Sequence, residues 1–150
     1  MMPQTPSSAL SPDTTLSASI TAKPVTVTGI SASNKVYDGL TGATVDASGI
    51  DETGIGLLPG DTGTESISAT GEFPDKNVGS GNTVTLTSST SGADASNYAF
   101  TNQTSTTADI TAKPVTVTGI TASNKAYDGL TGVTVDVSGI DETGIGILAG

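Results

Sequence analysis

Acidic side chains are the residues of this chain that come nearest to forming a chemical site. Asp51 and Glu52 are adjacent, and Asp61 follows nine residues after Glu52. Carboxylate oxygens are the ligands that Ca²⁺ prefers. Asp61 also begins the triplet Asp-Thr-Gly, which in aspartic proteases supplies one of two catalytic carboxylates. The acidic residues therefore raise two hypotheses, a calcium site and a carboxylate pair for hydrolysis.

Hydrolysis is the weaker of the two hypotheses. The aspartic-protease mechanism needs two carboxylates that share one proton, each placed on a loop after an apolar strand. Here the triplet occurs once, and it follows Leu58-Pro59-Gly60, which is typical of a turn. We therefore expect a turn at Asp61, no catalytic residues and no enzymatic activity.

The calcium hypothesis depends on oxygen ligands that are present but not arranged in a known pattern. The acidic residues fit neither an EF-hand loop nor the glycine-aspartate nonapeptide repeat. We expect no cofactor and no metal, and keep a weak calcium site at Asp51, Glu52 and Asp61 as the alternative. The main expectation is that these carboxylates cap turns and keep the chain soluble.

Composition excludes most other functions. The chain has 150 residues, a formal net charge of -10, and no cysteine, histidine, tryptophan or arginine. Disulfides, thiolate or imidazole metal sites and histidine-based triads are thereby excluded. The acidic balance argues against nucleic acid, which is bound through basic side chains. No apolar run is long enough to span a membrane, so we expect no membrane insertion.

A repeated block dominates the sequence. Residues 20–60 return as residues 110–150, and the two copies differ at only six of these positions. The chain therefore reads as part of a tandem array, with one complete unit and the start of another. Such repetition favours a role served by length, reach or avidity.

Alternating apolar and polar residues predict strands in the complete unit. The clearest run is residues 24–30, followed by residues 65–70 and 83–87, with weaker signals at 44–47 and 107–110. Turn-forming residues separate these runs, including the glycine-rich segment 79–82. One short helical turn is expected near residues 92–97, and residues 50–58 are expected to form a loop that buries Ile55 and Leu58. We predict an all-β fold, either a small β-sandwich or a β-grasp-like module.

The repeat sets the predicted domain organisation. Residues 1–22 are expected to be the tail of a preceding repeat or a disordered leader, residues 23–112 a complete repeat of about 90 residues, and residues 113–150 the start of the next repeat. Lys23-Pro24 and Lys113-Pro114 stand at the joins, where proline restricts the backbone to an extended form. We expect a semi-rigid array, in which residues 113–150 are poorly stable by themselves because their strands lack partners.

Four ordered motifs carry a family resemblance. They are Lys-Val-Tyr-Asp-Gly at 35–39, the glycine-rich run at 71–84, Ser-Gly-Ala-Asp-Ala-Ser-Asn-Tyr at 91–98 and Ala-Asp-Ile-Thr-Ala-Lys-Pro at 108–114. Together they resemble the YDG-type repeat of bacterial filamentous-haemagglutinin-like surface adhesins, which is related to MBG-type repeats. The motif Tyr37-Asp38-Gly39 returns as Tyr127-Asp128-Gly129. Each tyrosine is expected to place its ring in the core, ahead of a tight Asp-Gly turn.

The resemblance implies an extracellular β-rich module and no family active site. We expect a non-enzymatic structural or adhesive stalk, at the surface of a bacterium or secreted from it. Its partners would be neighbouring repeats in the same chain, and a host surface or glycan bound through other parts of the full protein. The alternative is a ligand-binding module, with a carbohydrate or weak calcium site repeated for avidity.

Overall fold

The computed structural model describes residues 2–3 and 16–148 and has an all-β fold, as predicted. Its main sheet has five strands in the order β3-β9-β7-β6-β4. In the described residues the only helical segment is the single turn η1 (Ala95–Asn97), close to where a helical turn was expected. The main sheet consists of β3 (Lys35–Val36), β4 (Gly42–Ala43), β6 (Ser66–Glu72), β7 (Gly79–Ser91) and β9 (Ser105–Thr111).

The centre of the sheet is formed by strands whose side chains alternate between core and solvent. β7 pairs antiparallel with both β6 and β9, and its residues Val84 and Leu86 are buried while Thr83, Thr85 and Thr87 are exposed. Ala108 and Ile110 of β9 join the same core. This period of two is the pattern that predicted these strands, because successive strand residues face opposite sides of a sheet.

Two short ladders complete residues 23–112. We call residues 23–112 the first copy, and the described residues 113–148, which repeat residues 23–58, the second copy. β2 (Ser31–Ala32) pairs antiparallel with β5 (Val45–Asp46). β1 (Lys23–Thr26) pairs parallel with β8 (Tyr98–Thr101), with Lys23 opposite Tyr98 and Thr26 opposite Thr101. Val25, Leu57 and Tyr98 form a small apolar cluster at this second ladder.

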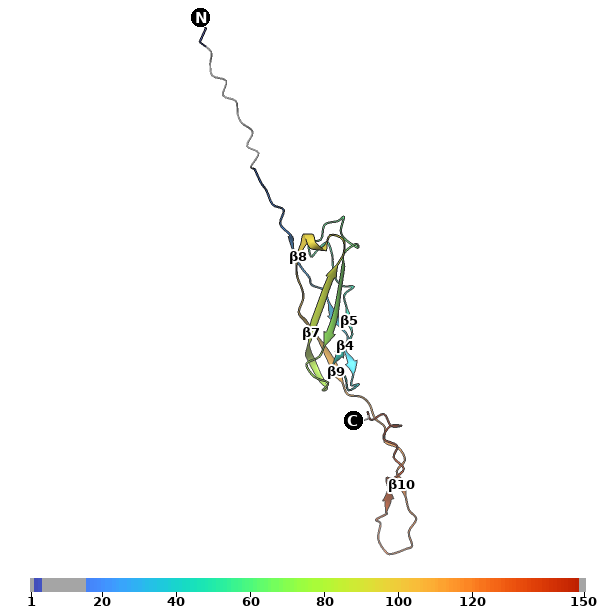
Figure 1. Ribbon diagram of the computed structural model, residues 1–150. Coiled ribbons are helices and arrows are strands. Elements are labelled where there is room, and N and C mark those ends of the chain that lie inside the picture. Colours follow the sequence, from blue (N-terminus) through green and yellow to red (C-terminus); the bar gives the residue numbers. More distant parts are fainter. Residues whose placement is uncertain (1, 4–15, 149–150) are drawn as a thin grey trace.

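The first and last parts of residues 23–112 run in the same direction. β1 is parallel to β8, and β3 is parallel to β9, with Lys35 opposite Ile110. As a result the chain enters the folded region beside β8 at one end and leaves after β9 at the other (Figure 1). We call these the N-proximal end and the C-proximal end.

Three sequence predictions in this region were wrong in detail. The strand predicted at residues 24–30 ends at Thr26, beyond which Val27 N still donates to Thr101 O at 2.8 Å. Residues 79–82 were expected to form a turn, but they lie within β7, where the register against β9 shifts between Gly79 and Asn82. Such a bulge uses the same flexible residues as a turn. Leu58 was expected in the core, but Leu57 is buried there and Leu58 is 51% exposed, because the loop turns one residue earlier.

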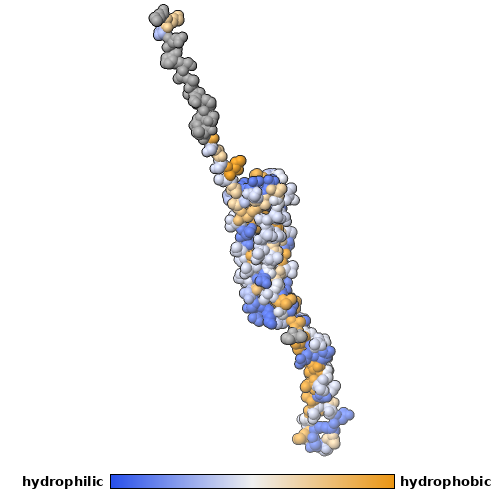
Figure 2. All heavy atoms as spheres, in the orientation of Figure 1, coloured by the Kyte–Doolittle hydropathy of each residue, from blue (hydrophilic) through white to orange (hydrophobic). Residues whose placement is uncertain are grey.

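The described part of the second copy has few long-range partners. Its two strands, β10 (Thr121–Ala122) and β11 (Val135–Asp136), pair in the same antiparallel register as β2 and β5. Val115, Val117 and Ile120 are exposed, whereas Val25, Val27 and Ile30 at the same repeat positions are buried. Figure 2 shows apolar side chains at the surface of this segment. The described second copy thus keeps its local shape without a core.

The residues that remain are those before residue 23 and after residue 148. Most of the predicted leader, residues 1 and 4–15, lies outside the described residues, as do residues 149 and 150. Residues 16–22 are exposed and form no strand. A search of the described residues finds no helix that combines the length and apolar character needed to cross a membrane.

Candidate functional site

The acidic residues singled out by the sequence lie on the loop between β5 and β6. Backbone hydrogen bonds wind residues 51–58 into a compact shape, with Ile55 N donating to Asp51 O at 2.9 Å and Leu57 N to Glu52 O at 3.0 Å. This winding turns Leu57 toward Val25 and Tyr98. The loop is therefore fixed to the core at the N-proximal end through an apolar anchor.

Each of the three candidate calcium ligands has a hydrogen-bond donor from the protein itself. The Asp51 carboxylate accepts from Gly54 N at 2.9 Å, and the Glu52 carboxylate accepts from Gly63 N at 2.6 Å. The Asp61 carboxylate accepts from the Tyr98 hydroxyl at 2.5 Å. Asp51 therefore caps a turn in its own loop. Glu52 ties this loop to the segment around Gly63, and Asp61 ties it to β8.

The carboxylates do not converge on one point. Across the part of the chain that the structure describes, no group of three or more acidic, histidine or cysteine side chains is arranged to hold a metal ion. With one oxygen of each carboxylate already occupied by a donor, a cation would have to compete with the loop's own hydrogen bonds. Calcium at Asp51, Glu52 and Asp61 remains a prediction for titration to test.

Tyr98 joins the acidic loop to the strand ladder. Its hydroxyl donates to Asp61 and accepts from Leu58 N at 3.1 Å, while its ring packs against Phe100 with centroids 5.8 Å apart. The hydrogen bond to the Asp61 carboxylate raises the pKa of the Tyr98 phenol, because losing the proton would leave two negative groups in contact. The hydroxyl thus acts as a structural clasp that stays protonated at neutral pH.

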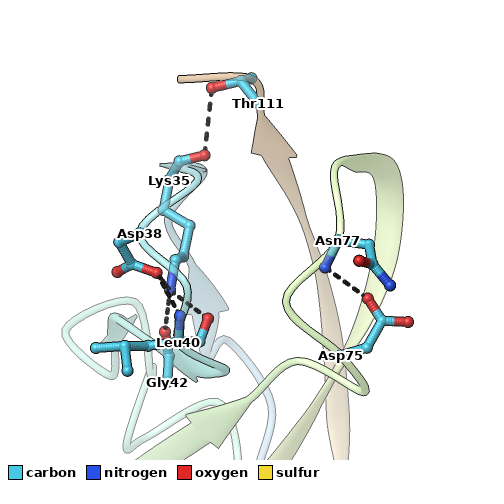
Figure 3. Close-up of polar contacts among 7 residues, drawn as sticks. All are labelled: Lys35, Asp38, Leu40, Gly42, Asp75, Asn77 and Thr111. Atoms are coloured by element: carbon cyan, nitrogen blue, oxygen red, sulfur yellow. Dashed lines mark hydrogen bonds and ion pairs between the residues drawn. The ribbon is translucent and has the colours of Figure 1, made fainter. Parts of the chain in front are cut away.

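The Tyr-Asp-Gly motif forms a turn at the C-proximal end, and Figure 3 shows its polar contacts. The Asp38 carboxylate accepts from Leu40 N at 2.9 Å and pairs with Lys35 Nζ at 2.7 Å. Lys35 Nζ also donates to the carbonyls of Leu40 and Gly42. Gly39 has a φ of 79°, a conformation that side chains other than glycine rarely adopt. The predicted Asp-Gly turn is therefore present, and a lysine holds it closed.

The turn is tied to the strand by which the chain leaves the first copy. Tyr37 N donates to Thr111 O at 2.8 Å, and the Thr111 hydroxyl donates to Lys35 O at 3.3 Å. Lys35 Nζ lies 5.8 Å from the centre of the Phe73 ring, within range of a cation–π contact. Thus the motif fixes the end of β9 relative to the main sheet.

Charge pairing has the same effect in both copies of this turn. The hydrogen bond from Lys35 lowers the pKa of the Asp38 carboxyl, and the one from Lys125 lowers that of Asp128. In each case the backbone N–H two residues further on adds to the shift. The turn is therefore a local structure that the first copy and the second copy form alike.

The two motif tyrosines differ, which corrects half of the prediction for them. Tyr37 is partly buried and packs against the core, as expected. Tyr127 was expected in a core too, but it is 97% exposed. The reason is that Tyr37 packs beside β9 and the main sheet, and no described residue of the second copy takes their place.

Several positioning residues were missed by sequence reasoning. The Gln103 amide clamps the backbone of Ile30, accepting from its N at 3.0 Å and donating to its O at 2.8 Å. Asn34 pairs with the backbone of Asp109 at 2.8 Å, and the Asp109 carboxylate accepts from Gly81 N. Glu65 is buried and accepts from Asp94 N at 2.9 Å. The partners of these residues are 28 to 75 residues away in the sequence, so no local pattern indicates them. By contrast, Lys35 and Asp38 of the Tyr-Asp-Gly turn are three residues apart, a spacing that can be seen in the sequence.

Comparison with known proteins gives one match. The family model described as the YDG domain matches residues 21–108, which is more than half of the chain. The match includes both the acidic loop and the Tyr-Asp-Gly turn of the first copy. No curated protein matches the chain, and no solved structure does.

Proposed function

The chain belongs to the YDG domain family, and from this premise we propose that it is a non-enzymatic link in a semi-rigid extracellular stalk. In this proposal each copy of the repeat spaces its neighbours apart and contributes no chemistry of its own. The stalk would belong to a bacterial surface or secreted adhesin, and would hold a distal binding region away from the cell. Such a region would recognise a host surface or a glycan.

The observation that carries this proposal is the parallel pairing of two early strands of residues 23–112, β1 and β3, with its two late strands, β8 and β9. β1 beside β8 and β3 beside β9 require the chain to advance along the long direction of the folded region. A domain whose ends lie together would instead fold its neighbours back on itself. A copy built this way adds length each time it is repeated, by about 3 nm for a compact 90-residue globule.

The join between the copies also supports a stalk. β9 ends at Thr111, and Lys113 corresponds in the repeat to Lys23, the first residue of β1. Ala112 alone separates the two positions, so no flexible linker lies between them. Pro114 restricts the backbone there further. Consecutive copies would therefore keep a short and constant spacing.

Composition and resemblance support the location. A chain without cysteine can cross a membrane unfolded without forming stray disulfides, which suits export from a bacterium. The net charge of -10 favours repulsion between neighbouring molecules over association. The resemblance to filamentous-haemagglutinin-like adhesins adds the adhesive context.

Solution scattering tests the spacing role. Small-angle X-ray scattering of this chain, and of a chain lengthened by one further copy of residues 23–112, should give maximum dimensions that differ by about 3 nm. A lengthened chain whose maximum dimension barely increases would show that the copies fold back, and the stalk proposal would be abandoned.

A ligand-binding module is the second candidate, because the acidic loop recurs. Asp141 and Glu142 stand at the repeat positions of Asp51 and Glu52, and Asp141 accepts from Gly144 N as Asp51 does from Gly54 N. Weak sites repeated along a chain gain avidity. Titration with Ca²⁺ and with glycans separates the candidates, since a ligand bound to the folded state raises the melting temperature. A spacer without a site would show no rise.

A further inference from the structure

A contact between the two copies singles out the Tyr-Asp-Gly turn. A Cβ atom built on Gly39 would lie 3.4 Å from the Leu148 Cδ1 atom of the second copy, which is van der Waals contact. Leu148 ends the second-copy loop 141–148, which repeats the acidic loop 51–58. The Leu148 side chain of the second copy therefore lies close to Gly39 at the C-proximal end of the first copy.

The surfaces around this contact are apolar on both sides. A cavity of about 400 Å³ lies at the join, and its apolar lining comes from the first copy through Tyr37 and Val78 and from the second through Val115, Ile147 and Leu148. Val78 is exposed, although it follows a turn held by Asp75, whose carboxylate accepts from Asn77 N at 2.7 Å (Figure 3). Val78 thus lines the same cavity as the apolar side chains of Ile147 and Leu148.

The second-copy loop is shaped before any partner reaches it. Ile145 N donates to Asp141 O at 3.0 Å and Ile147 N to Glu142 O at 3.1 Å. The same two bonds in the first copy measure 2.9 and 3.0 Å, although the first-copy loop packs on a core and the second-copy loop does not. Since the loop is preorganised, presenting Leu148 to a neighbour costs little ordering entropy.

Leu58 is the residue of the first copy that corresponds to Leu148. Leu58 lies at the N-proximal end, where its backbone N donates to Tyr98, the residue opposite Lys23 in the β1–β8 ladder. Its side chain is 51% exposed, against 37% for Leu148. One copy thus presents an apolar loop residue at its N-proximal end and an apolar surface beside the Tyr-Asp-Gly turn at its C-proximal end.

We propose that the Tyr-Asp-Gly turn and Val78 form a socket that receives the Leu148 loop of the following copy. The occupant is the next repeat of the same chain, and the joint sets the angle between copies. The hydrogen bond from Tyr37 N to Thr111 O keeps the socket in register with the strand that leads into that repeat. This inference rests on the proposed stalk function and assigns a role in it to the family motif.

The two equivalent leucines give a matched test by nuclear magnetic resonance on the 150-residue chain. Leu148→Asp should shift the amide resonances of Asp38, Gly39, Leu40 and Val78 and abolish nuclear Overhauser effects between the Leu148 methyls and Tyr37. Leu58→Asp makes the same change at the N-proximal end, away from Gly39 and Val78, and should leave those resonances in place. Val78→Asp should shift the Leu148 methyl resonances from the opposite side.

The outcomes separate the joint from the stalk. Unchanged resonances around Gly39 in Leu148→Asp, with no Overhauser contact between Leu148 and Tyr37 in the original chain, would overturn the joint. Equal shifts in Leu148→Asp and Leu58→Asp would overturn it as well, because the effect would not come from contact. Neither result alters the scattering dimensions on which the stalk depends, so a chain that lengthens by about 3 nm per copy without this contact would be a flexibly jointed stalk.

Discussion

Residues 23–58 and 113–148 have almost the same sequence and very different surroundings. Ile30 is 3% exposed and Ile120 is 54% exposed, although both follow a glycine with positive φ. In the first copy the strands β6 to β9 cover this face, whereas no described residues cover it in the second. Comparing the two copies therefore shows which features the repeated sequence forms by itself and which depend on strands β6 to β9.

The features common to both copies are local. A Cβ atom on Gly29 would clash with Gly49 O, and one on Gly119 would clash with Gly139 O, so both copies bring two backbones together at glycine. The ladder register and the lysine–aspartate turn also recur. Burial is what differs, and burial supplies most of the free energy of folding.

The largest expected difference is in hydrogen exchange. Amides of β7 and β9 should exchange only on global unfolding, whereas those of β10 and β11 should exchange through local opening. With a typical domain stability of about 5 kcal/mol, protection should differ by about three to four orders of magnitude. Exchange measured by mass spectrometry would test this. Equal protection in the two regions would show that the second copy has found a partner, for example in another molecule.

Truncation of the paired isoleucines should give the next largest difference. Ile30→Ala removes a buried side chain from the main core, and should lower the free energy of unfolding by about 3 kcal/mol. Ile120→Ala should change it by less than about 0.5 kcal/mol, as is usual at exposed positions. Urea unfolding of both variants measures this. A similar loss in both would mean that Ile120 is buried in solution.

Gly29 and Gly119 have the same backbone geometry in the two copies, so substituting them tests whether the copies differ in stability. Gly29→Ala meets both a positive φ and a backbone clash, and should cost about 2 kcal/mol of global stability. Gly119→Ala has the same clash, yet should leave the urea midpoint of the first copy unchanged while shifting resonances across β10 and β11. If Gly119→Ala lowered the midpoint as much as Gly29→Ala, the two copies would be folding as one unit.

The smallest expected effect is on the acid titration of the two motif aspartates. The pKa of Asp38 and that of Asp128 are both lowered by a lysine, so both carboxyls should titrate below the value of about 3.9 found in unfolded chains. A lowered folded pKa stabilises above the unfolded value, and this contribution is lost as the pH falls through the folded one. Carboxyl ¹³C shifts report it. An ordinary pKa for Asp128 beside a lowered one for Asp38 would show that the turn needs the main sheet.

The sequence predicted the strands and turns that depend on residues close together in the chain. Period-two alternation predicted β6 and the centre of β7, and Asp-Gly predicted the turn at Gly39. It failed at residues 79–82, because the same glycines serve a turn or a bulge, and only pairing with β9 decides between them. For the acidic loop, the sequence identified the carboxylates but not their donors. The Tyr98 hydroxyl comes from 37 residues away and follows no sequence period.

The parallel pairing of β1 with β8 and of β3 with β9 also hinders the exchange of equivalent segments between adjacent copies of nearly identical sequence. Adjacent domains of similar sequence misfold readily by swapping equivalent segments. To replace residues 23–60 within its own chain, the second copy would have to begin beside Tyr98, where Lys23 lies. Only Ala112 separates Thr111 from Lys113, and one residue spans at most about 3.6 Å, far less than the return along the module. Homogeneous repeats can therefore accumulate in one polypeptide without their halves being shuffled between neighbours.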